Sequence, residues 1–370
     1  MYNNRPFEPY YRIVIKKIIE KRLDGERITS DECLQLFRSK DVQAMGQLAN
    51  TLVDRLPSSG KVSYIVDRNI NYTNECTAEC HFCAFYEEAG SEKTYHLSRE
   101  QFKQKIQETV DNGGVQILLQ GGLSPKMKLS DYEELFSWIK ENFPVHLHAL
   151  SPPEIHYIAK KARLSLRDTI LRLKKAGLDS IPGGGAEILV DKIRRKISPK
   201  KCNTQEWISV MEAAHCNGLK SSATMMFGHI ETIEDRVEHL YRIRSLQEKT
   251  GGFTAFIPWS FQDQNTKLEG KYTKTSGLEY LKTLAISRIY LDNIDNVQAS
   301  WVTQGAKVGE MALFYGANDM GSVMMEENVV KAAGTSFSMT EKDIRRIIQN
   351  VRKTPVRRNF FYDFIETVGQ

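Results

Sequence analysis

The chain has 370 residues, of which 41% are hydrophobic and 26% are charged, a composition typical of globular proteins. Its formal charge of +5 is small for this length and forms no concentrated basic stripe, which argues against a nucleic-acid partner. No apolar stretch approaches the roughly 20 residues needed to cross a bilayer, and the N-terminus lacks the pattern of a secretory signal. We therefore expect a cytoplasmic protein without a membrane partner, in which clustered cysteines bind metal rather than form disulfides.

Predicted strands alternate with predicted helices from about residue 60 onwards. The stretch "VSYIVDRNINYT" (62–73) predicts a first strand that runs directly into a cysteine-rich loop. Residues 98–113 have the spacing of an amphipathic helix, and the apolar run "VQILLQGG" (115–122) predicts the second strand. Further strands are predicted at 145–150, 219–228, 253–261 and 296–301, each separated from the next by helical patterns.

Short apolar strands that alternate with helices indicate βα units and a parallel sheet. Roughly seven or eight such units favour an α/β fold closed as a TIM-type (β/α) barrel, with an open or incomplete barrel as the alternative. We predict an N-terminal helical extension over 1–60, the barrel over 61–335 and a C-terminal helical extension packed on the barrel over 336–370. The basic block 192–201 predicts a solvated loop or an anion contact.

Three cysteines, Cys76, Cys80 and Cys83, lie within eight positions of the loop after the first strand. The C-x3-C-x2-C spacing brings three thiolates together on a compact loop, and no second C-x2-C pair supplies the fourth ligand of a structural zinc site. Three ligands on a cluster that takes four leave one iron open to a second molecule, which is a catalytic arrangement. A loop after a barrel strand also lies at the mouth where barrel enzymes place their chemistry. A coincidental structural metal site is the alternative.

The motif C-x3-C-x-aromatic-C on the first βα loop of such a barrel resembles the radical S-adenosylmethionine (SAM) superfamily. The resemblance implies a [4Fe–4S] cluster held by Cys76, Cys80 and Cys83, with Phe82 beside it, and SAM bound to the fourth iron. It also implies that one electron from the reduced cluster cleaves SAM to methionine and a 5′-deoxyadenosyl radical. A small electron-donor protein such as a flavodoxin or ferredoxin is the expected partner.

Other positions match the superfamily in part. Its G-G-E sequence after the second strand is matched by Gly121 and Gly122, while Leu123 stands in place of the acid. Glu187 in "PGGGAEI" matches a polar contact to the cofactor ribose, and an ordinary first-turn helix glutamate is the alternative. The pattern G-x-I-x-G-x-x-E of the fifth strand is met in "TMMFGHIE" at Gly228 and at the final glutamate. The resemblance thus implies that these glycines and Glu187 bind the cofactor.

Longer strings narrow the resemblance to one branch of the superfamily. They are similar to the futalosine-pathway enzymes of menaquinone biosynthesis and the related deazaflavin-cofactor synthases, and they include "LHALSPPEI", "FTAFIPWSFQ" and "GANDMGSVMMEENVV". The activity this implies is an oxidative ring closure of a small-molecule substrate, dehypoxanthinyl futalosine. The adenosyl radical takes hydrogen from the sugar C4′, the carbon radical adds to the benzoate ring, and rearomatisation loses one proton and one electron.

Three other functions stay open at this point. Within the branch, the alternative is an aminofutalosine synthase, in which the adenosyl radical adds to an enolpyruvyl benzoate. Outside it, the alternatives are a non-catalytic iron–sulfur electron carrier, which usually has four cysteine ligands, and a zinc-binding protein.

Candidate substrate-binding and catalytic side chains follow several predicted strands. His229, at the end of the fifth strand, is predicted to accept the ring proton, and His148 to be catalytic or to contact the substrate. His146 lies on the same predicted strand as His148 and shares its face, and it is expected to be packed in the core. Trp259 is predicted to flank the benzoate, unless it is a simple core residue. Asn318 and Asp319 are predicted on a late loop near the mouth, where they bind sugar hydroxyls or cap the next helix.

Overall fold

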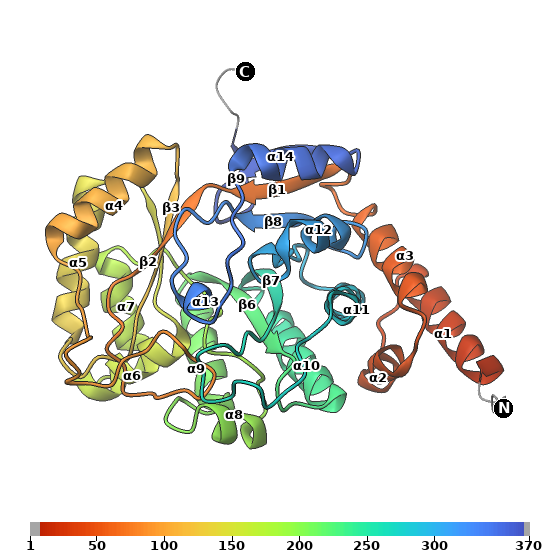
Figure 1. Ribbon diagram of the computed structural model, residues 1–370, viewed down its shortest axis with the longest axis horizontal. Helices are drawn as coiled ribbons and strands as arrows, with labels where there is room; N and C mark the ends of the chain where they lie inside the picture. Colours follow the sequence, from red (N-terminus) through yellow and green to blue (C-terminus); the bar gives the residue numbers. More distant parts are fainter. Residues whose placement is uncertain (1–7, 366–370) are drawn as a thin grey trace.

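The computed structural model of the protein describes residues 8–365, so residues 1–7 and 366–370 of the predicted terminal extensions lie outside it. Three helices open the chain, and α2 and α3 pack against the late helix α11 (Gly277–Tyr290) on one side of the molecule (Figure 1). They are α1 (Glu8–Leu23), α2 (Ser30–Arg38) and α3 (Val42–Val53). Residues 8–53 are thus largely helical, in the region where an N-terminal extension was predicted.

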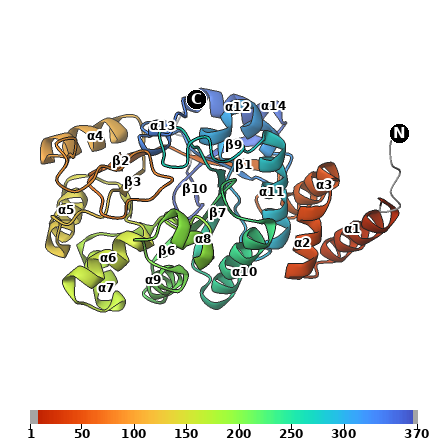
Figure 2. The ribbon, with the colours of Figure 1, turned by 60° about the horizontal axis from the view of Figure 1, so that its bottom comes forward.

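Six parallel strands in sequence order form the larger sheet of the molecule. They are β2 (Asp67–Asn71), β3 (Gln116–Gln120), β4 (His146–Ala149), β5 (Ser180–Ile181), β6 (Lys220–Phe227) and β7 (Phe253–Ser260). Helices connect successive strands and cover the outside of the sheet (Figure 2). They are α4 (Arg99–Asp111), α5 (Leu129–Asn142), α6 (Pro152–Ala162), α7 (Leu166–Ala176), α8 (Asp191–Ile197), α9 (Thr204–Cys216) and α10 (Ile233–Thr250).

A second sheet in the order β10-β9-β1-β8 completes the wall of the barrel. It contains β1 (Lys61–Ile65), β8 (Asp319–Ser322), β9 (Thr354–Arg358) and β10 (Phe364–Ile365). Because β1 runs straight into β2, one extended stretch of chain belongs to both sheets. Parallel bridges from Phe256 to Val297 and from Gln298 to Asp319 link β7 to β8. The predicted α/β barrel is therefore confirmed, although the strand predicted at 296–301 is reduced to these two bridges.

The last part of the chain differs from the helical tail that the sequence predicted. Of its described residues, 341–350 form helix α14 (Glu341–Asn350), which lies along β9 and β1 (Figure 1). The next residues pair in parallel with β1 as β9, and β10 then turns back antiparallel to β9. The edge of β1 offers unpaired backbone groups to the tail, so pairing competes successfully with helix formation there. The remaining helices are α12 (Trp301–Ala312) and α13 (Val329–Ala332).

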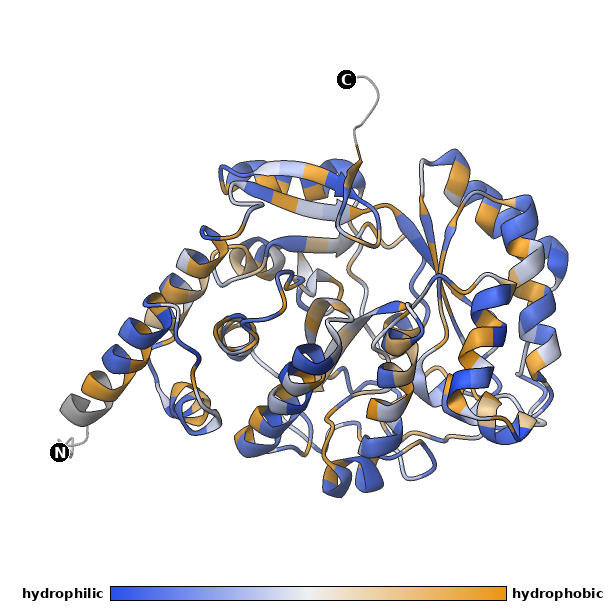
Figure 3. Ribbon diagram, turned by 180° about the vertical axis from the view of Figure 1, so that it is seen from behind, coloured by the Kyte–Doolittle hydropathy of each residue, from blue (hydrophilic) through white to orange (hydrophobic). Residues whose placement is uncertain are grey.

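Alternation along the strands separates an apolar outside from an inside that carries both polar and apolar side chains. Ile117, Leu119 and Ala223 point outwards and are fully buried beneath the helices, whose apolar sides face the strands (Figure 3). Their neighbours Gln116 and Ser222 point into the barrel instead and line a cavity. A barrel interior filled only by packing usually carries branched apolar residues, so the polar side chains along this cavity indicate a binding site. Among the described residues, no helix is long and apolar enough to cross a membrane.

Candidate active site

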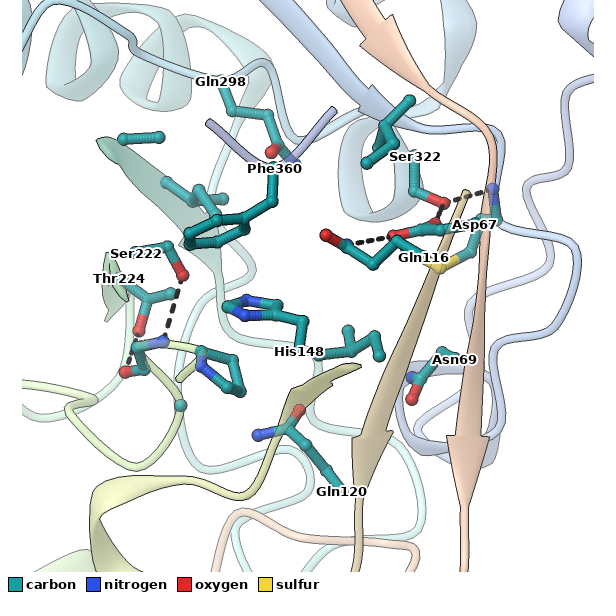
Figure 4. A pocket seen from close by; sticks show the side chains of 18 of the residues that line it. Asp67, Asn69, Gln116, Gln120, His148, Ser222, Thr224, Gln298, Ser322 and Phe360 are labelled. Carbon is teal, nitrogen blue, oxygen red and sulfur yellow. Dashed lines mark hydrogen bonds between the residues drawn. The ribbon is translucent and has the colours of Figure 1, made fainter. Parts of the chain in front are cut away.

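A cavity of 280 Å³ occupies the inside of the barrel and receives side chains from both sheets (Figure 4). At its deep end, Asp67 accepts hydrogen bonds from the Gln116 amide at 2.8 Å and from the Ser322 hydroxyl. Burial raises the pKa of Asp67, and these two hydrogen bonds oppose the rise. Polar side chains continue along the strands towards their carboxyl ends and include Asn69, Gln120, Ser222 and Thr224.

The cysteine loop begins where β2 ends, at the carboxyl edge of the barrel, because all strands of the larger sheet run in one direction. A buried carboxylate, Glu75, anchors its start by accepting hydrogen bonds from Ser124 at 2.6 Å and His96 at 3.1 Å. The ammonium group of Lys126 lies 2.8 Å from the same carboxylate. Backbone hydrogen bonds from Cys76 to Glu87 and from residue 77 to residue 123 then hold the loop against the rest of the mouth.

The three cysteines share one apolar environment. Cys80 is buried, Cys76 and Cys83 are half-buried, and Ala78 and Leu123 pack around them. The Cys76 sulfur accepts hydrogen bonds from the backbone N–H groups of Leu123 at 3.3 Å and Ala78 at 3.4 Å. Burial raises the pKa of Cys80 to about 12 and also raises that of Cys83. Such thiols ionise when a positively charged metal centre takes the place of their protons.

The chemistry of these donors, three thiols on one short loop, fits an iron–sulfur cluster. Within residues 8–365, no three His, Cys, Asp or Glu side chains converge as the ligands of one metal ion do. Three thiolates that each bind a different iron of a cubane do not need such convergence. Backbone N–H groups aimed at a cysteine sulfur are also the contacts that stabilise cluster thiolates. The residues present therefore fit a [4Fe–4S] cluster held by three cysteines.

The glycine pair after β3 lets the second loop of the mouth lie directly against the cysteine loop. A Cβ atom on Gly122 would lie 2.2 Å from the Glu75 carbonyl oxygen, and one on Gly121 would lie 2.5 Å from the Tyr72 ring. Leu123, at the position of the family's acid, turns its apolar side chain onto the cysteines. The pair is thus needed for close approach of two backbones, whatever further contact it makes.

Sequence reasoning missed a buried carboxylate behind these glycines. Glu154, near the start of α6, accepts hydrogen bonds from the Gly121 N–H at 3.1 Å and from the Tyr72 hydroxyl at 2.7 Å. It also accepts hydrogen bonds from the backbone and side chain of Ser151, which precedes the helix. Burial raises the pKa of Glu154, and these donors oppose the rise. The S-x-x-E pattern of a capping box was the available signal.

Glu187 lies on the wall of the cavity, beside a cationic pair that the sequence did not place there. Its carboxylate is 3.1 Å from the Lys201 ammonium and 3.4 Å from the Arg194 guanidinium. Lys201 also lies 5.0 Å from the centre of the Phe82 ring, so it joins the cysteine loop to Glu187. The block 192–201, predicted as a solvated loop or an anion contact, is a loop only after residue 197: residues 191–197 form α8, and Arg194 turns inwards to backbone carbonyl groups.

His229 does not have the position that a proton acceptor needs. Its side chain is fully buried and does not line the cavity. Nδ1 accepts a hydrogen bond from the Ile230 N–H at 2.8 Å, and Nε2 lies 3.1 Å from the Met226 carbonyl oxygen. Burial lowers the pKa of His229, although Glu231 opposes the change. Both ring nitrogens therefore serve the turn after β6, where the N–H of Gly228 (φ +92°) donates to Glu231.

Asn318 and Asp319 were predicted near the mouth, and the structure corrects this. Asp319 begins β8, at the opposite end of the barrel from the cysteine loop. Its carboxylate accepts two hydrogen bonds from Arg358, at 2.6 and 2.9 Å, and one from Ser63 at 2.6 Å. Asn318 accepts a hydrogen bond from Arg288 at 2.6 Å. Both side chains hold the closed end together and do not line the cavity.

Two other predicted side chains do line the cavity. Trp259 lies near the carboxyl end of β7, on the same side of the barrel as the cysteine loop. His148 lies deeper, under the ring of Phe360 (Figure 4). Phe360 belongs to the turn between β9 and β10, which closes the deep end of the cavity together with Arg358 and Tyr362. No local pattern in the tail indicated that these residues reach the site.

Two parts of the chain match known protein families. Residues 70–243 match the radical SAM superfamily, and residues 250–370 match the CofH/MqnC C-terminal region. The fold is similar to that of the FeFe-hydrogenase maturase HydG from Carboxydothermus hydrogenoformans, with a TM-score of 0.76. That likeness has 18% identity and covers 96% of this chain and 84% of the maturase. It concerns the fold alone.

Relatives in sequence carry two different names. The chain is 42% identical to the cyclic dehypoxanthine futalosine synthase of Halalkalibacterium halodurans, over 95% of each protein. It is 39% identical to the synthase of the same name from Streptomyces coelicolor, over 95% of this chain and 89% of the relative. The 5-amino-6-(D-ribitylamino)uracil–L-tyrosine 4-hydroxyphenyl transferase of Methanothermobacter thermautotrophicus is 41% identical, over 95% of this chain and 98% of that protein.

Proposed function

Because the chain belongs to the radical SAM superfamily, in the branch that shares the CofH/MqnC C-terminal region, we propose that it cyclises dehypoxanthinyl futalosine in the futalosine route to menaquinone. The observation that carries this proposal is the 42% identity to a cyclic dehypoxanthine futalosine synthase over 95% of both proteins. The cavity supports it, since a pocket lined by both polar and apolar side chains suits a substrate that combines a sugar with an aromatic acid.

A [4Fe–4S] cluster bound by Cys76, Cys80 and Cys83 supplies, when reduced, the electron that converts SAM to methionine and a 5′-deoxyadenosyl radical. The chain's own task is to bind and orient. We assign SAM binding to the residues nearest the cysteine loop, and the substrate sugar to the polar side chains on the cavity wall, with Trp259 beside the benzoate. The SAM-binding residues in this proposal are Phe82, Gly121, Gly122, Glu187 and Gly228.

The reaction removes two hydrogen atoms from the substrate. The C4′ hydrogen leaves with the adenosyl radical as 5′-deoxyadenosine, the C4′ carbon bonds to the benzoate ring, and that ring then loses a proton and an electron. The β9–β10 turn closes the deep end of the cavity, so water is kept from the carbon radical on that side.

The test uses anaerobically purified enzyme with substrate that carries deuterium at C4′. From the labelled substrate we expect deuterium in the 5′-deoxyadenosine. From unlabelled substrate we expect a cyclised product that is two mass units lighter than the substrate. Cys80→Ala should lose the cluster and all SAM cleavage, whereas Cys216→Ala, at an exposed thiol, should keep both. Unlabelled 5′-deoxyadenosine from the wild type, or full activity in Cys80→Ala, contradicts the proposal. In a parallel incubation with the enolpyruvyl benzoate, adenosyl retained in the product would indicate the aminofutalosine reaction instead.

A second candidate function rests on the methanogen relative, whose identity to this chain is 41%. Under that alternative the enzyme joins the hydroxyphenyl group of tyrosine to 5-amino-6-(D-ribitylamino)uracil. Incubation of the same preparation with each substrate set, followed by mass spectrometry of the products, separates the two functions. We expect product only from dehypoxanthinyl futalosine.

We further propose that a small electron-donor protein of the flavodoxin or ferredoxin class reduces the enzyme, and that it works in the cytoplasm. The need for free thiols at the cysteine loop supports a reducing compartment, and the six cysteines are all unpaired within the described residues. Reconstitution of activity with a purified flavodoxin or ferredoxin in place of a chemical reductant tests the first point.

A further inference from the structure

Two histidines on β4 share one serine hydroxyl on β5. The Ser180 oxygen lies 2.7 Å from Nδ1 of His148 and 2.7 Å from Nε2 of His146. His146 and His148 are two positions apart on one strand, so their side chains point to the same face, and His148 pairs with Ser180 across the sheet. Ser180 is fully buried. The three groups form one continuous chain of hydrogen bonds.

The two ends of this chain lie in different environments. His148 lines the cavity, and among residues 8–365 its Nε2 has no protein partner. His146 lies at the start of β4, at the far end of the barrel, where its ring is partly exposed. Phe360 packs over both rings, with centroid distances of 4.9 Å to His146 and 4.7 Å to His148. The hydrogen-bond chain therefore leads from the cavity to the partly exposed end and is shielded along its length.

Both imidazoles are neutral at pH 7. Burial lowers the pKa of His146 to about 4; Asp179 opposes this and Lys140 adds to it. Burial also lowers the pKa of His148, and the positive charge of Arg358 acts in the same direction, as a proton on His146 would at lower pH. A neutral imidazole has one N–H and one acceptor nitrogen, and a hydroxyl can accept one hydrogen bond while it donates another. Every donor and acceptor in this hydrogen-bond chain therefore has a partner when all the hydrogen bonds point in one direction.

We propose that His148, Ser180 and His146 form a proton relay that carries the ring proton of the rearomatisation step out of the cavity. The inference rests on the proposed cyclisation, which must release that proton, and on the failure of His229 to reach the cavity. It gives His148 the role of catalytic base and makes Ser180 and His146 positioning and relay residues.

The transfer balances as follows. The ring C–H bond breaks, its proton binds Nε2 of His148, and one electron leaves for an acceptor of the iron–sulfur class. The Nδ1 proton of His148 moves to Ser180, the Ser180 proton moves to Nε2 of His146, and the Nδ1 proton of His146 passes to water. Each histidine ends in its other neutral tautomer, and the hydrogen bonds point the opposite way. One proton has left the substrate and one has reached solvent.

Ser180→Ala tests the relay, because it removes the hydroxyl and leaves both rings. The chain offers a matched control in Ser221→Ala. Ser221 lies on β6, and its hydroxyl is 2.7 Å from Nε2 of His215 on α9; neither residue lines the cavity. The readouts are the ratio of cyclised product to 5′-deoxyadenosine and the solvent deuterium isotope effect on that ratio.

We expect Ser180→Ala to lower the ratio by about tenfold or more, within the ~10²–10⁴ ceiling for loss of a general base, and Ser180→Thr to restore it. His146→Gln, at the partly exposed end, should lower the ratio as well and guards against misfolding of the buried variant. In the cofactor-free protein, ¹⁵N NMR should show the two histidines in matched tautomers in the wild type and in Ser221→Ala but not in Ser180→Ala.

Unchanged product ratios in both Ser180→Ala and His146→Gln overturn the relay while the cyclase function stands. A wild-type protein that forms no cyclised product overturns the cyclase function and the relay with it. Unmatched tautomers in the wild type also contradict the relay, whatever the activity shows.

Discussion

The ion pair between Arg358 and Asp319 holds the tail of the chain beneath the barrel, and its removal should destabilise the whole protein. Both side chains are buried, Asp319 completely, and two hydrogen bonds of 2.6 and 2.9 Å join them. Arg358→Met keeps much of the side-chain volume but removes the charge. The Asp319 carboxylate would then retain the Ser63 hydroxyl and the Gly321 N–H as donors, but no positive charge from the described residues at hydrogen-bond distance.

The expected cost follows from that geometry. Breaking a buried pair by removing one partner costs about 3–5 kcal/mol, because the other charge stays buried. An unfolding entropy of about 2.1 cal/mol/K per residue gives about 0.8 kcal/mol/K for 370 residues. The melting temperature should therefore fall by about 4–6 °C. Adding Asp319→Asn to Arg358→Met should recover part of the loss, since it removes the unpaired charge.

Thermal unfolding followed by circular dichroism measures the effect, with Arg346→Met as the control. Arg346 pairs with Asp343 at 3.0 Å in the same part of the chain, but the two side chains are 68% and 35% exposed. Exposed pairs contribute about 0–1 kcal/mol, so this variant should melt within about 1 °C of the wild type. If Arg358→Met loses no more than Arg346→Met, the tail does not depend on this pair and our account of the closed end is wrong.

Two further predictions concern the cysteine loop and an ion-pair cluster between β2 and α4. Gly122→Ala places a Cβ 2.2 Å from the Glu75 carbonyl oxygen, so the cysteine loop must move. The reconstituted variant should hold clearly less iron than Gly277→Ala, whose Cβ lies no nearer than 3.2 Å to a valine methyl group. Equal iron content in the two variants would refute the close approach. Glu326 accepts hydrogen bonds from Lys105 and Arg68, both at 2.7 Å. Burial acts to raise its pKa, but hydrogen bonds from Lys105, Asn328 and Arg68 lower that pKa below 4.5. Because its folded-state pKa is lowered, its contribution is full above pH 4.5 and is lost as the pH falls through the lowered value. The difference in melting temperature between wild type and Glu326→Gln should therefore shrink from pH 7 to pH 3.5, and a difference that does not change with pH would contradict this.

Local features of the molecule were determined by the sequence itself. Ser98 and Gln101 form the capping box that begins α4, because both partners lie within one turn of each other. The spacing of three cysteines within eight positions predicts a shared site in the same way, since a short loop cannot separate them far. Alternation along the strands predicted which side chains share a face, including the two histidines of β4.

Only the tertiary structure decided which end of a strand and which neighbours a side chain meets. Asp319 begins strand β8 instead of lying on a loop at the mouth, and this places it at the opposite end of the barrel. Ser180 meets two histidines more than 30 positions earlier, and Phe360 reaches them from the far end of the chain. Such contacts depend on strand register and on where the tail finds an unpaired edge, and both are set by packing between distant segments, which no local pattern records.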